Sequence, residues 1–188
     1  MSHSDTRQSA ASRDADRIRL RKPDATDGTA VARLIRECPP LDRNSVYCNL
    51  LQCTDFADTC ILAERDGDVV GWISGYRPPA EPDTLFVWQV AVHERARGCG
   101  LAGRMLEALV ERADCEDVVR MKTTITPDND GSFALFRSFA KRMDAPFDES
   151  DGFDKHEHFD GRHDSERLIT IGPIPDREAA QADSRSAA

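Results

Sequence analysis

A short segment rich in glycine and arginine has the residue types that bind an anionic group. Gly98 and Gly100 flank Cys99, and Arg95 and Arg97 precede them. Glycine lets the backbone turn so that successive N–H groups converge on one point, and a helix that begins there adds its positive end. The arginines add positive charge. A pyrophosphate fits this chemistry, but two glycines also serve a plain strand-to-helix turn, so both interpretations are open at this point.

The apolar periodicity places this segment between a strand and a helix. Residues 84–92 form a long run typical of a strand. From Leu101 to Ala113, apolar residues recur at helical spacing. A Rossmann loop is disfavoured, because the third glycine is missing and no βαβ unit with a ribose-binding acid follows.

The remaining elements define the fold class. A helix capped by Thr26 ends before Pro39 and Pro40, and the turn at residues 66–68 joins two strands as a hairpin. Strands mixed with helices in this order predict an α/β sandwich around a mixed sheet. The other expected strands are residues 18–22, 60–64, 69–76, 118–125 and 168–171, and the other expected helices are residues 44–53 and 130–142.

Length and composition indicate a single folded domain. At 188 residues one hydrophobic core suffices, and we expect it within residues 17–175. Residues 1–16 and 176–188 lack apolar periodicity, so we expect disordered tails there.

Charge and cysteine usage exclude several classes of function. Acidic residues outnumber basic ones by 34 to 25, which argues against nucleic-acid binding, because a phosphate backbone needs a basic surface. No apolar run has the length of a bilayer-spanning helix, so no membrane partner is expected. The six cysteines contain no CxxC pair, and His156, His158 and His163 fit no common ligand spacing, so we expect no metal. We expect a cytoplasmic protein with reduced thiols.

Two segments resemble the GNAT (Gcn5-related N-acetyltransferase) superfamily. Arg95, Gly98 and Gly100 stand at the three defining positions of its pyrophosphate loop, and residues 129–136 resemble its Asn-x-x-(Ala/Ser)-x-x-Leu-(Tyr/Phe) signature. The resemblance implies a GNAT fold, with a mixed, mostly antiparallel central sheet flanked by helices, and acetyl-CoA as co-substrate. It implies contacts to acetyl-CoA from Val90, Ala91, Val92, Arg95, Arg97, Gly98, Cys99, Gly100, Leu101, Ala102, Asn129, Ser132 and Phe136.

Some of these positions have simpler interpretations, and one departs from the family. Asn129 also suits a helix N-cap, and Phe136 suits ordinary core packing. Many GNAT enzymes place a tyrosine where this chain has Phe136, and that hydroxyl protonates the departing thiolate. Phenylalanine cannot donate a proton, so another group or a water serves, or the thiolate leaves without a protein acid.

Four further segments are similar to the diaminobutyrate acetyltransferase family of ectoine biosynthesis. They are residues 40–47, residues 86–92, residues 123–129, and residues 157–159 together with 163–166. The resemblance implies acetylation of the side-chain (N4) amine of L-2,4-diaminobutyrate, in the synthesis of an osmoprotective solute. Asp42 and Glu166 are implied as catalytic acids or bases that also bind substrate. The other implied substrate-binding residues are Asn44, Tyr47, Trp88 and His163.

Other interpretations of these residues stay open. Asp42 and Asn44 also suit helix caps, Trp88 a core position, and the C-terminal acids a solvated face. The acceptor could be another small amine, such as a polyamine or aminoglycoside, or a protein N-terminus. A non-catalytic acyl-CoA-binding domain is the alternative from a different class. We also expect a homodimer, since an exposed sheet edge invites pairing.

Overall fold

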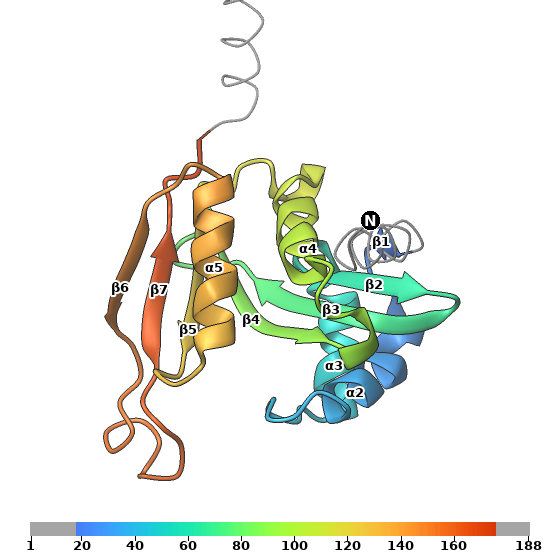
Figure 1. Cartoon of the computed structure of the whole chain (residues 1–188), viewed down its shortest axis with the longest axis horizontal. Coiled ribbons are helices and arrows are strands. Elements are labelled where there is room, and N and C mark those ends of the chain that lie inside the picture. Colours follow the sequence, from blue (N-terminus) through green and yellow to red (C-terminus); the bar gives the residue numbers. More distant parts are fainter. Residues whose placement is uncertain (1–17, 176–188) are drawn as a thin grey trace, which may run out of the picture. The chain divides into compact units, whose positions relative to one another are not determined.

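The computed structural model describes residues 18–175 (Figure 1). The expected tails, residues 1–16 and 176–188, lie outside this range. The described residues form two compact units, one of residues 18–76 with Trp88–Glu116 and one of Arg77–Val87 with residues 117–175. The single domain over residues 17–175 therefore stays a prediction, and the units are described separately below.

A seven-stranded sheet has the strand order β1-β2-β3-β4-β5-β7-β6. The β1/β2, β2/β3, β5/β7 and β6/β7 pairs are antiparallel, whereas β4 and β5 are parallel. This confirms the expected mixed, mostly antiparallel sheet. The strands are β1 (Arg19–Arg21), β2 (Ile61–Arg65), β3 (Asp68–Tyr76), β4 (Thr84–Val92), β5 (Arg120–Ile125), β6 (Phe147–Asp151) and β7 (Arg167–Ile171).

Some helices and helical turns begin at residues whose side chains satisfy free backbone N–H groups. Ser45 accepts a hydrogen bond from the N–H of Cys48 at the start of α3. Asp24, and not the expected Thr26, caps the first helical turn, because its carboxylate accepts the N–H of Thr26. The α-helices are α2 (Gly28–Arg36), α3 (Val46–Thr54), α4 (Leu101–Val110) and α5 (Asp130–Arg142), and the 3-10 turns are η1 (Ala25–Asp27), η2 (Ala57–Thr59), η3 (Glu94–Ala96) and η4 (Ala113–Cys115).

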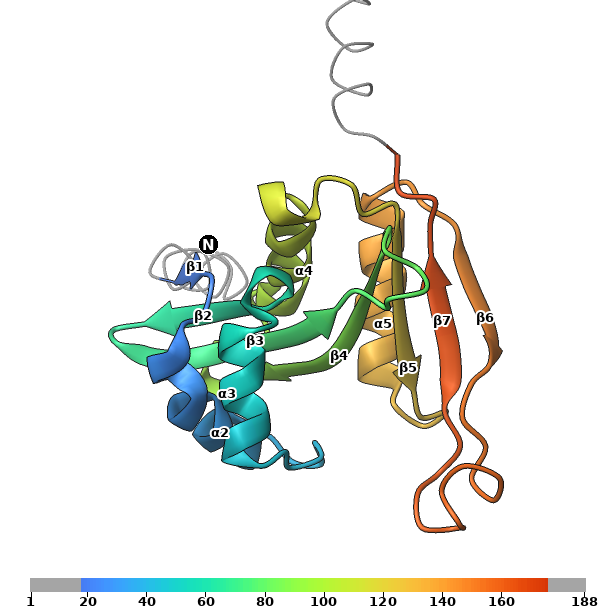
Figure 2. The ribbon, with the colours of Figure 1, turned by 180° about the vertical axis from the view of Figure 1, so that it is seen from behind.

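In the first unit, helices lie on both sides of β2 and β3 (Figures 1 and 2). Trp72 of β3 is fully buried among apolar side chains of α2 and α3, including Leu34 and Cys53. Gly71, the preceding residue, points the other way, toward α4. A Cβ atom at Gly71 would lie 2.8 Å from Met105 Sδ and 2.9 Å from Ala63 Cβ. Helix α4, which follows the segment of residues 95–102 (hereafter the glycine loop), is therefore held tightly on the sheet.

In the second unit, α5 runs along β5 and β7 (Figure 1). Phe136 and Phe139 of α5 are almost completely buried. Arg137 lies over the Phe133 and Phe147 rings, with its guanidinium carbon 5.2 and 5.1 Å from their centroids. These contacts join α5 to β6, a strand that the sequence did not lead us to expect.

The close approach of α4 to β3 gives a stability prediction. Gly71→Val should lower the free energy of unfolding by about 1–3 kcal/mol, because the added carbons overlap the Met105 and Ala63 side chains. Urea denaturation measures the change. Gly131→Ala is the matched control, since a Cβ at Gly131 comes no nearer than 3.8 Å to its closest neighbour. Equal unfolding midpoints for Gly71→Val and the wild type would contradict this packing.

Candidate active site

The glycine loop lies where the sequence placed it, between the end of β4 and the start of α4. Gly98 and Gly100 have positive φ angles of +79° and +71°, a conformation that other residues rarely adopt. A Cβ at either position would meet nothing within 4 Å, so the backbone conformation, and not crowding, calls for glycine. Gly100 is the N-cap of α4 and offers no side chain to the first N–H groups of the helix. The loop therefore presents backbone donors beside open space, as an anionic group requires.

The two arginines of the loop have partners within the first unit. Arg95 donates from Nη2 to Asp68 Oδ2 over 2.8 Å. Arg97 donates from Nε to the backbone oxygen of Val92 over 2.9 Å, which folds its side chain back on the end of β4. In this arrangement the hydrogen-bond donors that the loop can offer to an anion are chiefly its backbone N–H groups, including those at the N-terminal end of α4.

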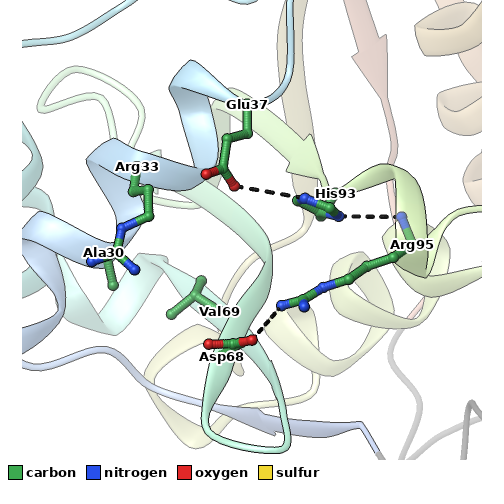
Figure 3. Close-up of a pocket in the computed structure, with 7 residues that line it drawn as sticks. All are labelled: Ala30, Arg33, Glu37, Asp68, Val69, His93 and Arg95. Carbon is green, nitrogen blue, oxygen red and sulfur yellow. Dashed lines mark hydrogen bonds and ion pairs between the residues drawn. The ribbon is translucent and has the colours of Figure 1, made fainter.

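His93 fixes the turn that leads into the loop (Figure 3). Its Nδ1 accepts the backbone N–H of Arg95 over 3.2 Å, and its Nε2 lies 3.6 Å from Glu37 Oε2. The hydrogen bond from Arg95 lowers the pKa of the Asp68 carboxyl below its ordinary value. These groups line a shallow cavity of about 280 Å³, formed by Ala30, Arg33, Glu37, Asp68, Val69, His93 and Arg95.

Two of the residues expected to bind substrate in the first unit, Asp42 and Asn44, contact Gln89. Its Nε2 donates to the backbone oxygen of Asp42 over 2.9 Å, and its Oε1 lies 3.4 Å from Asn44 Nδ2. Asp42 and Asn44 do not cap α3, because Ser45 does. The cap interpretation of these two residues is therefore wrong.

Two aromatic residues expected near the substrate are exposed. Trp88 has a relative exposure of 50%, and its ring meets Tyr76 edge-on at 6.4 Å between centroids. The core interpretation of Trp88 is therefore wrong. Tyr47, in the first turn of α3, is 69% exposed. Both rings are accessible to a small molecule.

The second unit carries the other expected residues. Asn129 caps α5 by accepting the N–H of Ser132 over 3.0 Å, as its simpler interpretation predicted. Phe136 is 2% exposed, in agreement with core packing. The His163 ring lies tilted against the Phe159 ring, with centroids 4.7 Å apart, and its Nδ1 lies 2.7 Å from the backbone oxygen of Asp164.

Glu166 is held by its backbone directly before β7. Its N–H donates to Phe153 O over 2.7 Å, and its oxygen accepts the N–H of Gly152 over 3.0 Å. Its side chain is half-buried, whereas Asp164 is exposed and paired with Lys155. Of these two acids, only Asp164 therefore fits the interpretation of a solvated face.

Buried thiols of the first unit are poor nucleophiles. Burial raises the pKa of the Cys53 and Cys60 thiols to about 12, so at neutral pH both stay protonated. All six cysteines are free. Within residues 18–175, no three His, Cys, Asp or Glu side chains are grouped to hold a metal ion, and no helix is long and apolar enough to cross a membrane.

Gln89 and His93 were not singled out from the sequence. A signal existed for Gln89, because it shares the buried face of β4 with Val87 and Ala91, where a polar residue needs a partner. His93 gave no such signal, since its partner Glu37, the residue that follows α2, is far away in the sequence.

Comparison with known proteins agrees with this geometry. Residues 29–140 match the model of the acetyltransferase (GNAT) family. L-2,4-diaminobutyric acid acetyltransferase of Methylotuvimicrobium alcaliphilum is 51% identical over 157 residues, which is 84% of this chain and 91% of that protein. The protein of the same name from Halomonas elongata is 45% identical, covering 86% of this chain and 84% of its own length.

Solved structures of acetyltransferases also resemble this chain. Diaminobutyrate acetyltransferase of Paenibacillus lautus, in complex with its substrate L-2,4-diaminobutyric acid and coenzyme A, superposes with a TM-score of 0.80. It is 42% identical and covers 84% of this chain and 96% of its own. Ribosomal-protein-alanine N-acetyltransferase of Brucella melitensis shares the fold at 21% identity, with a TM-score of 0.62 and coverage of 84% and 99%. By these matches, the chain belongs to the acetyltransferase (GNAT) family.

Proposed function

We propose that this chain is an acyltransferase that moves the acetyl group of acetyl-CoA to the side-chain (N4) amine of L-2,4-diaminobutyrate. The observation that carries the proposal is the likeness to a solved diaminobutyrate acetyltransferase, 42% identical over 84% of this chain, whose complex holds diaminobutyrate and coenzyme A. A polyamine, an aminoglycoside or a non-catalytic role is not favoured by relatives of this name.

The glycine loop fits the pyrophosphate of acetyl-CoA. The positive φ angles at Gly98 and Gly100, and the open space around both, allow a bulky anion to reach the backbone N–H groups of residues 98–102. Residues 90–92, at the end of β4, would hold the pantetheine arm by their backbone. When bound, the co-substrate supplies a thioester carbonyl carbon that an amine can attack.

The reaction needs an acidic group to pair with the substrate and a group that accepts a proton. Diaminobutyrate carries two ammonium groups and one carboxylate at neutral pH, so one ammonium can pair with Asp42 while the other amine reacts. The reacting amine must first be neutral, because an ammonium has no lone pair. Its lone pair then forms the N–C bond and the C–S bond breaks. Glu166, or a water beside it, accepts the proton that the amine releases.

Other residues would contact the substrate. The exposed Trp88 ring offers an apolar wall that also attracts a cation, and Asn44, Tyr47 and His163 supply polar contacts. Phe136 is buried and has no proton to give, so the thiolate of coenzyme A leaves without an acid from this position.

The product would serve ectoine biosynthesis and thus osmoprotection. We propose that the enzyme works in the cytoplasm as a homodimer. Light scattering after size exclusion tests the dimer.

The direct test is the release of coenzyme A thiol by purified protein. L-2,4-diaminobutyrate is compared with ornithine, lysine and spermidine at equal concentration, and the acetylated nitrogen is identified by NMR. We expect kcat/KM to be highest for diaminobutyrate, with the acetyl group on the side-chain nitrogen. Turnover that favours another amine, or none with any amine despite bound acetyl-CoA, would refute the proposal.

The glycine loop gives a second prediction. Gly100→Val forces a β-branched residue into positive φ at a cost of about 1–3 kcal/mol, so we expect the KM for acetyl-CoA to rise by about tenfold or more. Gly67→Val is the matched control, because Gly67 also has positive φ and open surroundings but lies in the β2–β3 turn. If both variants changed this KM equally, the loop would have no special role in binding the co-substrate.

Asp42 gives a third prediction. Asp42→Asn removes a charge-assisted hydrogen bond of about 1.5–3 kcal/mol to the substrate ammonium, so the KM for diaminobutyrate should rise about 10- to 100-fold. The kcat should change little, because the bond is made equally in the ground and transition states. Asp66→Asn, the same charge change in the β2–β3 turn, is the control. Wild-type kinetics in Asp42→Asn would remove Asp42 from the site.

A further inference from the structure

We infer that Gln89 is a positioning residue, which holds the loop that carries Asp42 in the place where the substrate ammonium binds. This inference rests on the proposed function and deepens it. Gln89 itself touches neither the substrate nor the co-substrate in this account; it acts through the loop.

The first support is the geometry of the Gln89 side chain. Its amide nitrogen donates to the Asp42 backbone oxygen over 2.9 Å, and its amide oxygen lies 3.4 Å from Asn44 Nδ2. The amide of Gln89 therefore donates one hydrogen bond and accepts another. Its two partners, Asp42 and Asn44, are the first and last residues of a three-residue segment. Gln89 is 9% exposed, so water competes little for these hydrogen bonds.

The second support is the place of this segment in the chain. The segment connects α2 to α3 and is fixed at one end by the hydrogen bond from Leu41 N–H to Cys38 O, 3.2 Å long. At the other end it is fixed by Ser45, the cap of α3. Gln89 adds a fixed point between these ends, and it comes from a strand far away in the sequence. A loop held in its binding conformation loses less conformational entropy when the ligand arrives.

The third support is the alternation of side chains along β4. Gln89 lies on the buried face of the strand, whereas its neighbour Trp88 points to the other face and is half exposed. Strand β4 thus presents Trp88 on one face and anchors the loop that carries Asp42 on the other. The relative placement of Trp88 and the loop is therefore set by two consecutive residues.

Glutamine is the side chain that meets these requirements. Leucine has a similar size but makes neither hydrogen bond. Glutamate keeps an acceptor for Asn44, yet its carboxylate would face the Asp42 oxygen without a proton to donate. Asparagine is one methylene shorter and cannot span the same two partners.

The principal experiment compares steady-state kinetics of Gln89→Leu with the wild type. We expect the KM for diaminobutyrate to rise about tenfold, the effect of losing one hydrogen-bond pair, with kcat and the KM for acetyl-CoA nearly unchanged. Gln52→Leu is the matched control, because Gln52 is also a buried glutamine of the same unit, and its side chain has no hydrogen-bond partner within residues 18–175. Its kinetics should stay within about twofold of wild type.

A double substitution separates positioning from a general structural role. If Gln89 acts through Asp42, adding Gln89→Leu to Asp42→Asn should cause little further rise in the KM for diaminobutyrate. Effects of Gln89→Leu and Asp42→Asn that multiply fully would overturn the inference.

Hydrogen exchange of the ligand-free protein gives a readout that does not depend on the substrate. The backbone amides of residues 41–45 should exchange faster in Gln89→Leu than in the wild type or Gln52→Leu. Unchanged exchange together with an unchanged KM would overturn the inference while the proposed function stands. If the wild type does not acetylate diaminobutyrate, the proposed function fails and the positioning role falls with it, even where exchange is faster.

Discussion

The hydrogen bonds of the Gln89 side-chain amide are the interactions on which the position of Asp42 depends. A glutamine on the buried face of a strand would destabilise the fold if its polar atoms had no partners. Here both ends of the amide are used by the segment between α2 and α3, over 2.9 and 3.4 Å. The hydrogen bonds that the buried amide needs therefore also connect Asp42 to β4.

Beyond Gln89, β4 runs on into the glycine loop. The loop relies on backbone N–H groups at two positive-φ glycines and on the start of α4, while Arg95 is engaged with Asp68. The tight packing of Gly71 against α4 keeps that helix in place. In the proposed function the backbone of the loop would bind the anionic co-substrate and acidic side chains would bind the cationic amine, a division in keeping with the net charge of −9.

Local patterns predicted much of the fold, because apolar periodicity reports which face of an element is buried. Residues 84–92 and 130–142 form β4 and α5 as expected, and the glycine loop lies where the motif placed it. β6 was missed because its sequence, Phe-Asp-Glu-Ser-Asp, has almost no apolar residues; it is an edge strand that is exposed along most of its length. The partners of Gln89, Arg95 and His93 could not be predicted, since each is distant in sequence and chosen by tertiary packing.

A crystal structure of the protein with coenzyme A and L-2,4-diaminobutyrate tests the central claim most directly, because it locates both molecules at once. The account predicts the pyrophosphate on the N–H groups of residues 98–102 and one substrate ammonium within hydrogen-bond distance of the Asp42 carboxylate. The Asp42 backbone oxygen should still be bonded to Gln89. A substrate ammonium held by other groups, with Asp42 turned to solvent, would contradict it.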